Sequence, residues 1–240
     1  MAGMDWYKGK VVNIIDETYN IKRFFVELPE LERAKFLPGQ YVQVDFPIES
    51  SKTYRQYSIA SPPNGDNTIE LLIVLDPKGM ATNYLFSEVD HGSELIISRF
   101  MGNFVLPEKL EEDVCFISTG TGLAPLRSMY LDLLKRGNPG QKVNLVFEKK
   151  KKKDLIYIDE IKELEEQYPN FNFYPVLSRE DDPSWNGRRG YVHDIYKELY
   201  QGGQSAQFFI CGWRNMVREA RQNLMKMGYH RRDIHFERYN

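Results

Sequence analysis

The chain has 240 residues, of which 42% are hydrophobic and 28% charged, a balance typical of a folded protein with one large domain or two modest ones. Its formal net charge of -2 excludes a global positive field for nucleic acid, so any charged partner has to meet a local patch. Cys115 and Cys211 are too few for a disulfide framework or a cysteine-ligated cluster, which favours a reducing cytoplasm.

The chain up to residue 107 reads as short strands separated by turn signals such as LPGQ and PPNGDN. The expected strands are KVVNIIDET (10–18), IKRFFVEL (21–28), GQYVQVDF (39–46), YRQYSIAS (54–61), TIELLIVL (68–75) and SELIISRF (93–100). Many short strands with few helices predict a small antiparallel barrel. One exception is GMATNYLFSEV, whose apolar spacing predicts a short helix behind a possible cap at Thr82.

From residue 108 the pattern changes to apolar runs that alternate with helical segments. The expected strands are VCFIST (114–119), KVNLVFE (142–148), FNFYPVLS (171–178) and AQFFICG (206–212). The helical segments that follow them are residues 124–137, 155–168, 190–200 and 214–228. Strands alternating with helices predict a parallel sheet covered on both faces. We therefore expect two domains, residues 1–107 and residues 108–240.

No apolar run approaches the length of about 20 residues that a membrane-spanning helix needs, and the sequence MAGMDWYKGK lacks the apolar core of a signal peptide. We therefore expect a protein that is neither secreted nor integral to a membrane. The four histidines show no metal-ligand spacing, so we expect no metal site, and His193 is expected to be a surface or capping residue.

The segment STGTGLAPLRSM lies where the first strand of the second half meets its helix. Gly120 and Gly122 would let a ligand approach the backbone, and a helix start offers free N–H groups to a phosphate. Pro125 fits the first helical turn, which needs no N–H, although the common dinucleotide fingerprint has a third glycine there. The segment is either a phosphate-binding turn or a structural strand-to-helix turn.

The expected end of the next strand, FEKKKKK, carries mixed signals about the coenzyme. Glu148 would suit a ribose 2′-hydroxyl and therefore NADH, whereas basic residues suit the 2′-phosphate of NADPH. Cations and a hydroxyl near the strand ends favour NADPH, with NADH as the alternative, and the residues concerned are Lys150, Ser178, Arg179 and Arg188. A solvated loop is the other interpretation of the lysine run.

If YRQYSIAS is a strand, Arg55 and Tyr57 project from one face and Gln56 and Ser58 from the other. An arginine beside an aromatic ring can bind a phosphate and stack on a planar heterocycle, although an ordinary barrel strand with an exposed arginine fits as well. Cys211 is either a small buried residue or a thiol at a strand end where open α/β sheets bind ligands. Cys115 is expected in the core.

Six segments occur in the order found in the ferredoxin–NADP⁺ reductase family, and together they span nearly the whole chain. They are RQYS (55–58), KGMATNYL (78–85), GNFVLP (102–107), STGTGLAPLRSM (118–129), ICGWRNMV (210–217) and FERY (236–239). The chain therefore resembles this family. The resemblance implies an N-terminal Greek-key FAD-binding barrel and a C-terminal NAD(P)-binding α/β domain.

The resemblance also implies roles for individual residues. Arg55 would pair with the flavin pyrophosphate, Tyr57 would lie against the isoalloxazine, and Ser58 would bond near its N5. Cys211 would pack near the nicotinamide C4, with Glu237 close by, and Tyr239 would cover the other flavin face. Ser58, Cys211, Glu237 and Tyr239 are thus the expected catalytic residues. The other expected cofactor-binding residues are Gln56, Gly79, Met80, Ala81, Thr82, Thr119, Gly120, Thr121, Gly122, Ala124, Pro125, Gly212 and Met216.

The implied activity is hydride transfer between NADPH and FAD, followed by single-electron transfer to a separate carrier, ferredoxin or flavodoxin. Two isolated cysteines do not supply the roughly four ligands of an iron–sulfur cluster, so we expect the acceptor to be another molecule. Three alternatives stay open: an NADH-dependent reductase component for an oxygenase, a reductase of free flavin or ferric chelates, and a non-catalytic nicotinamide-sensing module. A monomer suffices for any of these functions.

Overall fold

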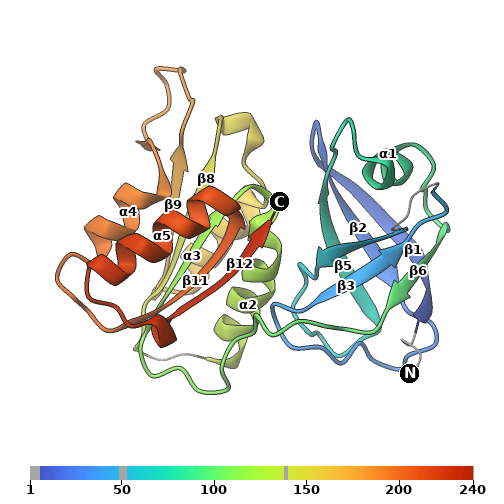
Figure 1. Cartoon of the computed structure of the whole chain (residues 1–240), viewed down its shortest axis with the longest axis horizontal. Helices are drawn as coiled ribbons and strands as arrows, with labels where there is room; N and C mark the ends of the chain where they lie inside the picture. The colour runs from blue at the N-terminus through green and yellow to red at the C-terminus, as the bar shows by residue number, and fades with distance from the viewer. Residues whose placement is uncertain (1–5, 49–52, 138–139, 240) are drawn as a thin grey trace. The chain divides into compact units, whose positions relative to one another are not determined.

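The computed structural model describes residues 6–48, 53–137 and 140–239 (Figure 1). They form two compact units. Unit 1 comprises the described part of Met1–Leu106 together with Arg127–Asp132, and unit 2 comprises Pro107–Leu126 and the described part of Leu133–Asn240. Because Arg127–Asp132 group with unit 1, the simple division at residues 107 and 108 stays a prediction.

Unit 1 is an antiparallel sheet that closes into a barrel. Among the described residues the strands follow the order β4-β3-β6-β1-β2-β5. A bridge between Ile59 and Leu71 joins the two ends of this order, and the Ala60 N–H donates to the Glu70 carbonyl at 2.8 Å beside it. The strands are β1 (Trp6–Thr18), β2 (Ile21–Glu27), β3 (Tyr41–Asp45), β4 (Tyr54–Ser58), β5 (Thr68–Val74) and β6 (Glu94–Ser98).

The barrel forms because apolar side chains alternate along its strands. In β2, for example, Phe24 and Val26 are fully buried, whereas Phe25 between them is only half-buried. The helix α1 (Met80–Ser87) follows β5 and adds Ala81 and Leu85 to the same core. After α1, strand β6 enters between β3 and β1 rather than beside β5, which is a Greek-key connection. The predicted fold of the N-terminal half is confirmed.

Unit 2 is a parallel sheet with helices on both faces. Among the described residues the strand order is β10-β9-β8-β7-β11-β12, and all of these strands pair in parallel. The strands are β7 (Asp113–Thr119), β8 (Val143–Lys149), β9 (Phe171–Leu177), β10 (Arg188–Arg189), β11 (Ala206–Trp213) and β12 (Ile234–Tyr239). The helices are α2 (Leu123–Arg136), α3 (Ile158–Gln167), α4 (Val192–Leu199) and α5 (Arg214–Lys226). Short 3₁₀ turns are formed by η1 (Gly120–Gly122), η2 (Lys152–Asp154) and η3 (Arg231–Asp233).

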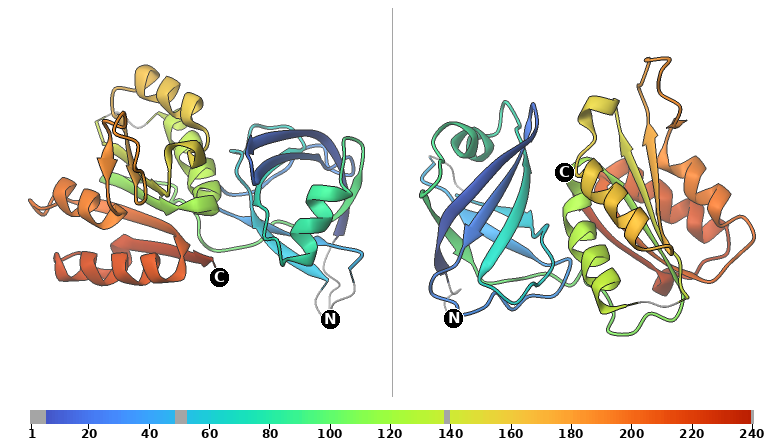
Figure 2. Two further views of the ribbon diagram at one scale, coloured as in Figure 1. Left: turned by 90° about the horizontal axis from the view of Figure 1, so that it is seen from above. Right: turned by 180° about the vertical axis from the view of Figure 1, so that it is seen from behind.

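The connections of unit 2 reverse direction at β7. The chain passes from β7 through α2 and α3 to β8 and β9 on one side, and then through α4 and α5 to β11 and β12 on the other side. Because parallel crossovers are right-handed, α2 and α3 cover one face, and α4 and α5 cover the other (Figure 2). A ligand is expected outside the carboxyl ends of β7 and β11, where the order reverses.

Two predictions about local structure need correction. Thr82 does not cap α1: Gly79 is the N-cap residue, and the Thr82 hydroxyl lies within hydrogen-bond distance of the carbonyl oxygens of Asp76 at 3.0 Å and Gly79 at 3.1 Å. The last strand, β12, was absent from the expected elements, although its sequence IHFERY pairs along most of β11. In the part of the chain that the structure describes, we find no helix with the length and apolar character required to traverse a bilayer.

Candidate functional site

In unit 1, an aromatic row connects β4 with α1. Tyr57 and Tyr84 both pack edge-on against Phe46, with ring centroids 6.4 and 6.0 Å from it. Burial raises the pKa of Tyr57 above its usual range, and the nearby charge of Arg55 opposes this shift. Arg55 and Tyr57 therefore interact, as alternation along β4 predicts. Phe46 and Tyr84, which hold this arrangement, were not among the predicted residues.

The other candidates of unit 1 lie on the same elements. The Arg55 guanidinium donates to the Tyr54 carbonyl at 2.9 Å, while Gln56 is exposed and donates to the Tyr41 hydroxyl at 3.2 Å. Ser58 is buried at the end of β4. At the start of α1, Met80 is exposed and Ala81 is buried. A Cβ on Gly79 would lie 2.9 Å from the Thr82 hydroxyl, so a side chain in this turn would displace Thr82.

In unit 2, the loops that follow β7 and β11 interlock through two glycines. A Cβ on Gly122 would lie 2.5 Å from the Cys211 carbonyl oxygen, and a Cβ on Gly212 would lie 2.2 Å from the Thr119 hydroxyl. Gly212 also has φ of +147°, a conformation that side chains rarely adopt. The Thr119 hydroxyl accepts the Trp213 backbone N–H at 3.1 Å. The structure thus brings together the GTG turn and the Cys211–Gly212 segment.

The GTG turn itself offers backbone to a ligand. No side chain caps η1 or α2 through a hydrogen bond, in contrast to a helix start closed by its own Ser, Thr or Asp. A Cβ on Gly120 would meet a single described neighbour, the Trp213 indole nitrogen at 3.8 Å. Thr121 lies in the turn, and Ala124 and Pro125 are the second and third residues of α2, within its first turn.

Strand β12 places Glu237 and Tyr239 beside the end of β11. In the parallel register Cys211 pairs with Glu237, and Trp213 pairs with Tyr239. Cys211 is fully buried, and burial, followed by the Glu237 charge, raises the pKa of its thiol well above the usual range. A hydrogen bond with Tyr239 acts in the opposite direction. Cys211 therefore interacts with the other two predicted residues, Glu237 and Tyr239, within unit 2.

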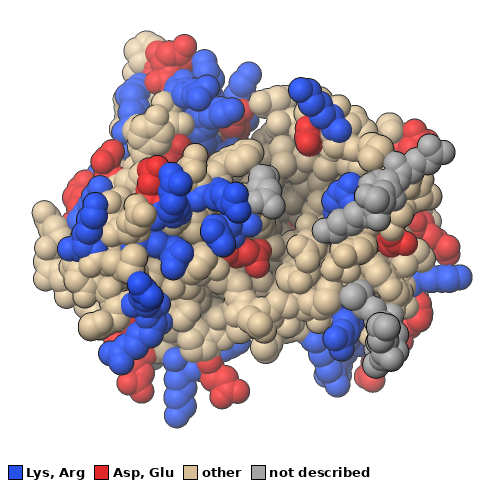
Figure 3. All heavy atoms as spheres, viewed as in Figure 1, with Lys and Arg blue, Asp and Glu red and all other residues tan. Residues whose placement is uncertain are grey.

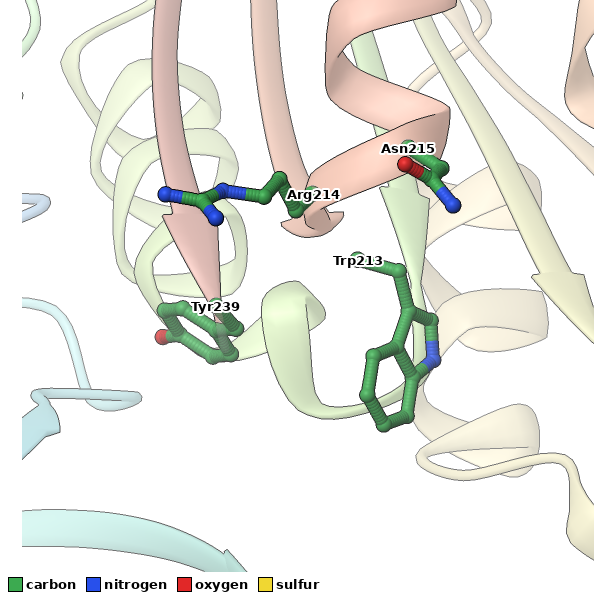
Figure 4. Close-up of a pocket in the computed structure, with 4 residues that line it drawn as sticks. All are labelled: Trp213, Arg214, Asn215 and Tyr239. Atoms are coloured by element: carbon green, nitrogen blue, oxygen red, sulfur yellow. The ribbon is translucent and has the colours of Figure 1, made fainter.

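An open hollow of about 510 Å³ lies at this strand edge. It is lined by Trp213, Arg214, Asn215 and Tyr239. Figure 4 shows the rings of Trp213 and Tyr239 beyond the ends of the strands that carry them. Trp213, Arg214 and Asn215 were not predicted as functional residues, although their position directly after Cys211 and Gly212 is a usable signal. Met216 is buried within the core of unit 2, and its contact with a cofactor stays a prediction.

The residues expected near a 2′-phosphate divide into two groups. Lys150 and Arg179 lie side by side, because the Arg179 N–H donates to the Lys150 carbonyl at 2.9 Å, with Ser178 next to them. Arg188 instead forms a two-pronged ion pair with Glu198, with one distance of 2.8 Å. The Glu198 carboxylate therefore neutralises Arg188, so Lys150 and Arg179 are the better candidates for binding a 2′-phosphate.

Glu148 makes a contact that its sequence position did not suggest. Its carboxylate accepts the Val192 N–H at the start of α4, at 3.3 Å. Burial raises the pKa of Glu148, and hydrogen bonds from Val192 and Ser178 oppose the shift. One function of this carboxylate is therefore to hold the first turn of α4. His193 bonds Tyr196 and Glu219, and no group of three or more His, Cys, Asp or Glu side chains among the described residues could hold a metal ion.

Both cysteine thiols are expected to resist modification in the folded protein. Cys115 and Cys211 are fully buried, and burial raises the pKa of both, so little thiolate forms near neutral pH. A chromogenic disulfide reagent at about pH 8 should react with less than roughly a tenth of the thiols within minutes. After unfolding in guanidinium it should titrate two thiols per chain. Rapid labelling of Cys211 in the native protein, located by mass spectrometry, would contradict the burial argument.

Two family models match the two units in chain order. The oxidoreductase FAD-binding domain matches residues 8–105, and the oxidoreductase NAD-binding domain matches residues 116–222. The chain therefore combines an FAD-binding domain with an NAD-binding domain, the composition of a flavoprotein oxidoreductase. It is 32% identical to ferredoxin–NADP reductase B of Sorangium cellulosum, over 90% of this chain and 92% of that protein. The chain belongs to the ferredoxin–NADP⁺ reductase family, which confirms the resemblance.

Other relatives add a second group of reductases. The chain is 32% identical to the reductase component DmpP of a Pseudomonas phenol 2-monooxygenase, over 97% of this chain and 65% of that protein. It spans 63% to 65% of the length of three such oxygenase components. Among solved structures, the Amycolatopsis cytochrome P450 reductase GcoB has a TM-score of 0.89 at 30% identity, covering 99% of this chain and 71% of that chain. A Neisseria gonorrhoeae ferredoxin NADP⁺ reductase with bound FAD and NADP has a TM-score of 0.81 at 26% identity, covering 98% and 99%.

Proposed function

We propose that the protein is an FAD-dependent reductase that takes hydride from NADPH and passes electrons singly to a separate carrier, ferredoxin or flavodoxin. The observation that carries this proposal is the interlocked edge of unit 2. There the GTG turn, Cys211, Glu237 and Tyr239 meet at the ends of β7, β11 and β12. Such an edge, at the point where the strand order reverses, suits a dinucleotide with its reacting ring beside Cys211.

The residues of unit 1 fit a flavin dinucleotide by their chemistry. Arg55 supplies a charged donor for a phosphate, Tyr57 an aromatic ring for a planar heterocycle, and Ser58 a hydroxyl at the strand end. The Gly79 turn, which a Cβ would fill, brings backbone to the start of α1. When bound, the flavin supplies the chemistry of accepting hydride and releasing single electrons.

The residues of unit 2 contribute binding and orientation. The free N–H groups around the GTG turn would hold the coenzyme pyrophosphate, and Lys150, Ser178 and Arg179 would bind the 2′-phosphate of NADPH. Cys211 presents an uncharged thiol, because its pKa is raised, so it packs against the nicotinamide without a competing charge. The Glu237 carboxylate beside it would stabilise the positive charge that develops on the nicotinamide ring as hydride leaves.

An acidic carrier would find a local positive patch on unit 2. Arg221 lies over the Phe236 ring at 3.7 Å, with Arg238 at 5.8 Å from the same ring. Partial burial, and then the charges of Arg238 and Arg231, lower the pKa of Arg221, which shows that these cations share one region. Figure 3 shows Lys and Arg side chains over α5 and β12. We assign the docking of an acidic protein to this patch, and propose a monomer in the cytoplasm.

An anaerobic titration tests the proposed function directly. Addition of NADPH to the purified yellow protein should bleach the flavin absorbance near one equivalent. Reduced ferredoxin should then form in steady state, read as cytochrome c reduction that depends on added ferredoxin. Equal cytochrome c reduction without ferredoxin would count against a carrier of this kind. A colourless protein that does not bind added FAD would overturn the flavoprotein proposal.

A second candidate, an NADH-dependent reductase component of an oxygenase, is favoured by the relatives of phenol and xylene monooxygenases. The discriminating measurement is kcat/KM with NADH and with NADPH at limiting concentration. Replacement of Arg179 by Ala should reduce the preference for NADPH by about tenfold, because one charge-assisted contact is lost. If the unaltered protein has a higher kcat/KM with NADH, and Arg179→Ala leaves the coenzyme preference unchanged, the oxygenase alternative is selected.

Glu237→Gln is expected to slow flavin reduction by about 10- to 100-fold, because the neutral amide no longer stabilises positive charge on the nicotinamide. Ser58→Ala should slow the same step by about tenfold, since it removes a hydrogen bond near the reacting atom. The measurement is stopped-flow absorbance with saturating NADPH. Glu163→Gln, an exposed residue on α3, is the matched control and should keep the original rate. If the Ser58→Ala, Glu237→Gln double variant also keeps that rate, both assignments are wrong.

A further inference from the structure

Trp213 occupies an unusual place at the ligand edge of unit 2. It is a large aromatic residue with 63% of its surface exposed, and it follows Gly212 directly at the end of β11. It is also the N-cap residue of α5 and lines the hollow together with Tyr239 (Figure 4). Single exposed tryptophans are common on protein surfaces, so the distinguishing feature of Trp213 is its orientation.

The backbone of Trp213 is held from both sides. Its N–H donates to the Thr119 hydroxyl at 3.1 Å, and the preceding Gly212 packs against the Thr119 backbone. In the parallel register Trp213 pairs with Tyr239 on β12. The backbone that carries the ring is therefore held at a fixed position relative to the GTG turn.

The indole nitrogen faces the turn. It is the one described atom within 4 Å of the position that a Gly120 Cβ would occupy, at 3.8 Å. Within the described residues the indole N–H has no hydrogen-bond acceptor, whereas the N–H of Trp185 donates to the Arg188 carbonyl at 3.1 Å. An indole N–H is a donor only, and on this exposed residue water accepts from it, so a ligand group that takes the place of that water has to be an acceptor.

We propose that the Trp213 indole N–H donates a hydrogen bond to the pyrophosphate of the bound dinucleotide, and so adds a side-chain donor to the backbone donors of the GTG turn. The inference rests on the proposed function, because it takes this turn as the dinucleotide site. The ligand class is a nucleoside diphosphate or a dinucleotide that contains one. The ring, being exposed on its other faces, also forms one wall of the hollow.

Isothermal titration with ADP tests this inference without any turnover. ADP carries the diphosphate but neither the nicotinamide nor the 2′-phosphate. Trp213→Phe keeps an aromatic ring and removes only the donor, and it should weaken ADP binding by about tenfold, the effect of one hydrogen bond to a charged group. Trp185→Phe is the matched control in the same unit and should bind ADP as the unaltered protein does. Equal thermal unfolding of the variants shows that folding is unaffected.

The outcomes separate this inference from the proposed function. If the unaltered protein does not bind ADP, the nucleotide site itself is wrong, and the inference falls with it. If the unaltered protein and Trp213→Phe bind ADP equally, the proposed function stands and the donor role is overturned. A third outcome is that Trp213→Phe binds normally, whereas Trp213→Leu weakens the binding of NADP⁺ but not of ADP. In that case the ring stacks on the nicotinamide, and the donor role is also overturned.

Discussion

Gly212→Ala should abolish reduction of the flavin by NADPH while the protein stays yellow. The new Cβ would lie 2.2 Å from the Thr119 hydroxyl and 3.0 Å from the Thr119 backbone nitrogen and oxygen. Rotation of the Thr119 side chain alone cannot relieve this overlap, because two of the three close atoms belong to the backbone. Overpacking of this kind and the φ of +147° together should destabilise unit 2 by about 3 kcal/mol. The GTG turn would have to move away from Cys211.

Two measurements check this result: urea unfolding followed by tryptophan fluorescence, and ADP binding by titration calorimetry. Gly228→Ala is the matched control, since Gly228 also has a positive φ, of +100°, but no atom lies within 4 Å of its Cβ position. The control should lose only about 1 to 2 kcal/mol for backbone strain and should bind ADP normally. Equal effects of the two variants on ADP binding would mean that the interlock does not shape the nucleotide site.

Arg55→Ala should weaken the binding of FAD by about 10- to 100-fold, because a charge-assisted hydrogen bond to the flavin phosphates is lost. The guanidinium is already oriented by its 2.9 Å bond to the Tyr54 carbonyl, so its fork is set before a ligand arrives. Arg55→Lys keeps the charge without the fork and should give an intermediate loss. Flavin released on ultrafiltration and quenching of flavin fluorescence on titration both measure the effect.

Riboflavin is the decisive control for Arg55, because it has the isoalloxazine but no phosphate. The unaltered protein and Arg55→Ala should bind riboflavin with the same affinity. Arg99→Ala, an exposed arginine of unit 1, should bind FAD normally. If Arg55→Ala lost riboflavin and FAD in equal proportion, Arg55 would support the ring pocket through Tyr57 rather than bind phosphate.

The fold was largely predictable because the relevant signals are local. Alternation along β2, which buries Phe24 and Val26, gives a strand of the barrel, and the regular exchange of apolar runs and helices gives the parallel sheet. Thr82 shows where a local rule fails: the hydroxyl that could cap a helix bonds the preceding Asp76 turn instead. The strand β12 was missed because its short sequence IHFERY mixes apolar and charged residues without a clear strand pattern, and its pairing with β11 across α5 makes it a strand.

The candidate site was predictable where the motif itself positions the chemistry, as in the GTG turn. It was less predictable where a side chain contacts an element that does not adjoin it in the sequence. Arg188 is paired with Glu198, and Glu148 holds the start of α4, because β10 and α4 pack where no sequence spacing reveals them. Trp213 was not predicted because a tryptophan after a strand forms no motif, and only its distance from Gly120 supports the role that we propose for it.

The mutual packing of Gly122 and Gly212 has a consequence for protein engineering. Each glycine leaves room for the backbone of the other loop, so a change in one loop is tolerated only with a compensating change in the other. Residues 119–122 and 211–213 therefore behave as one cassette. To change the coenzyme preference, one could replace residues 119–122 with the corresponding turn of another reductase. This replacement should succeed only when residues 211–213 are taken from the same reductase.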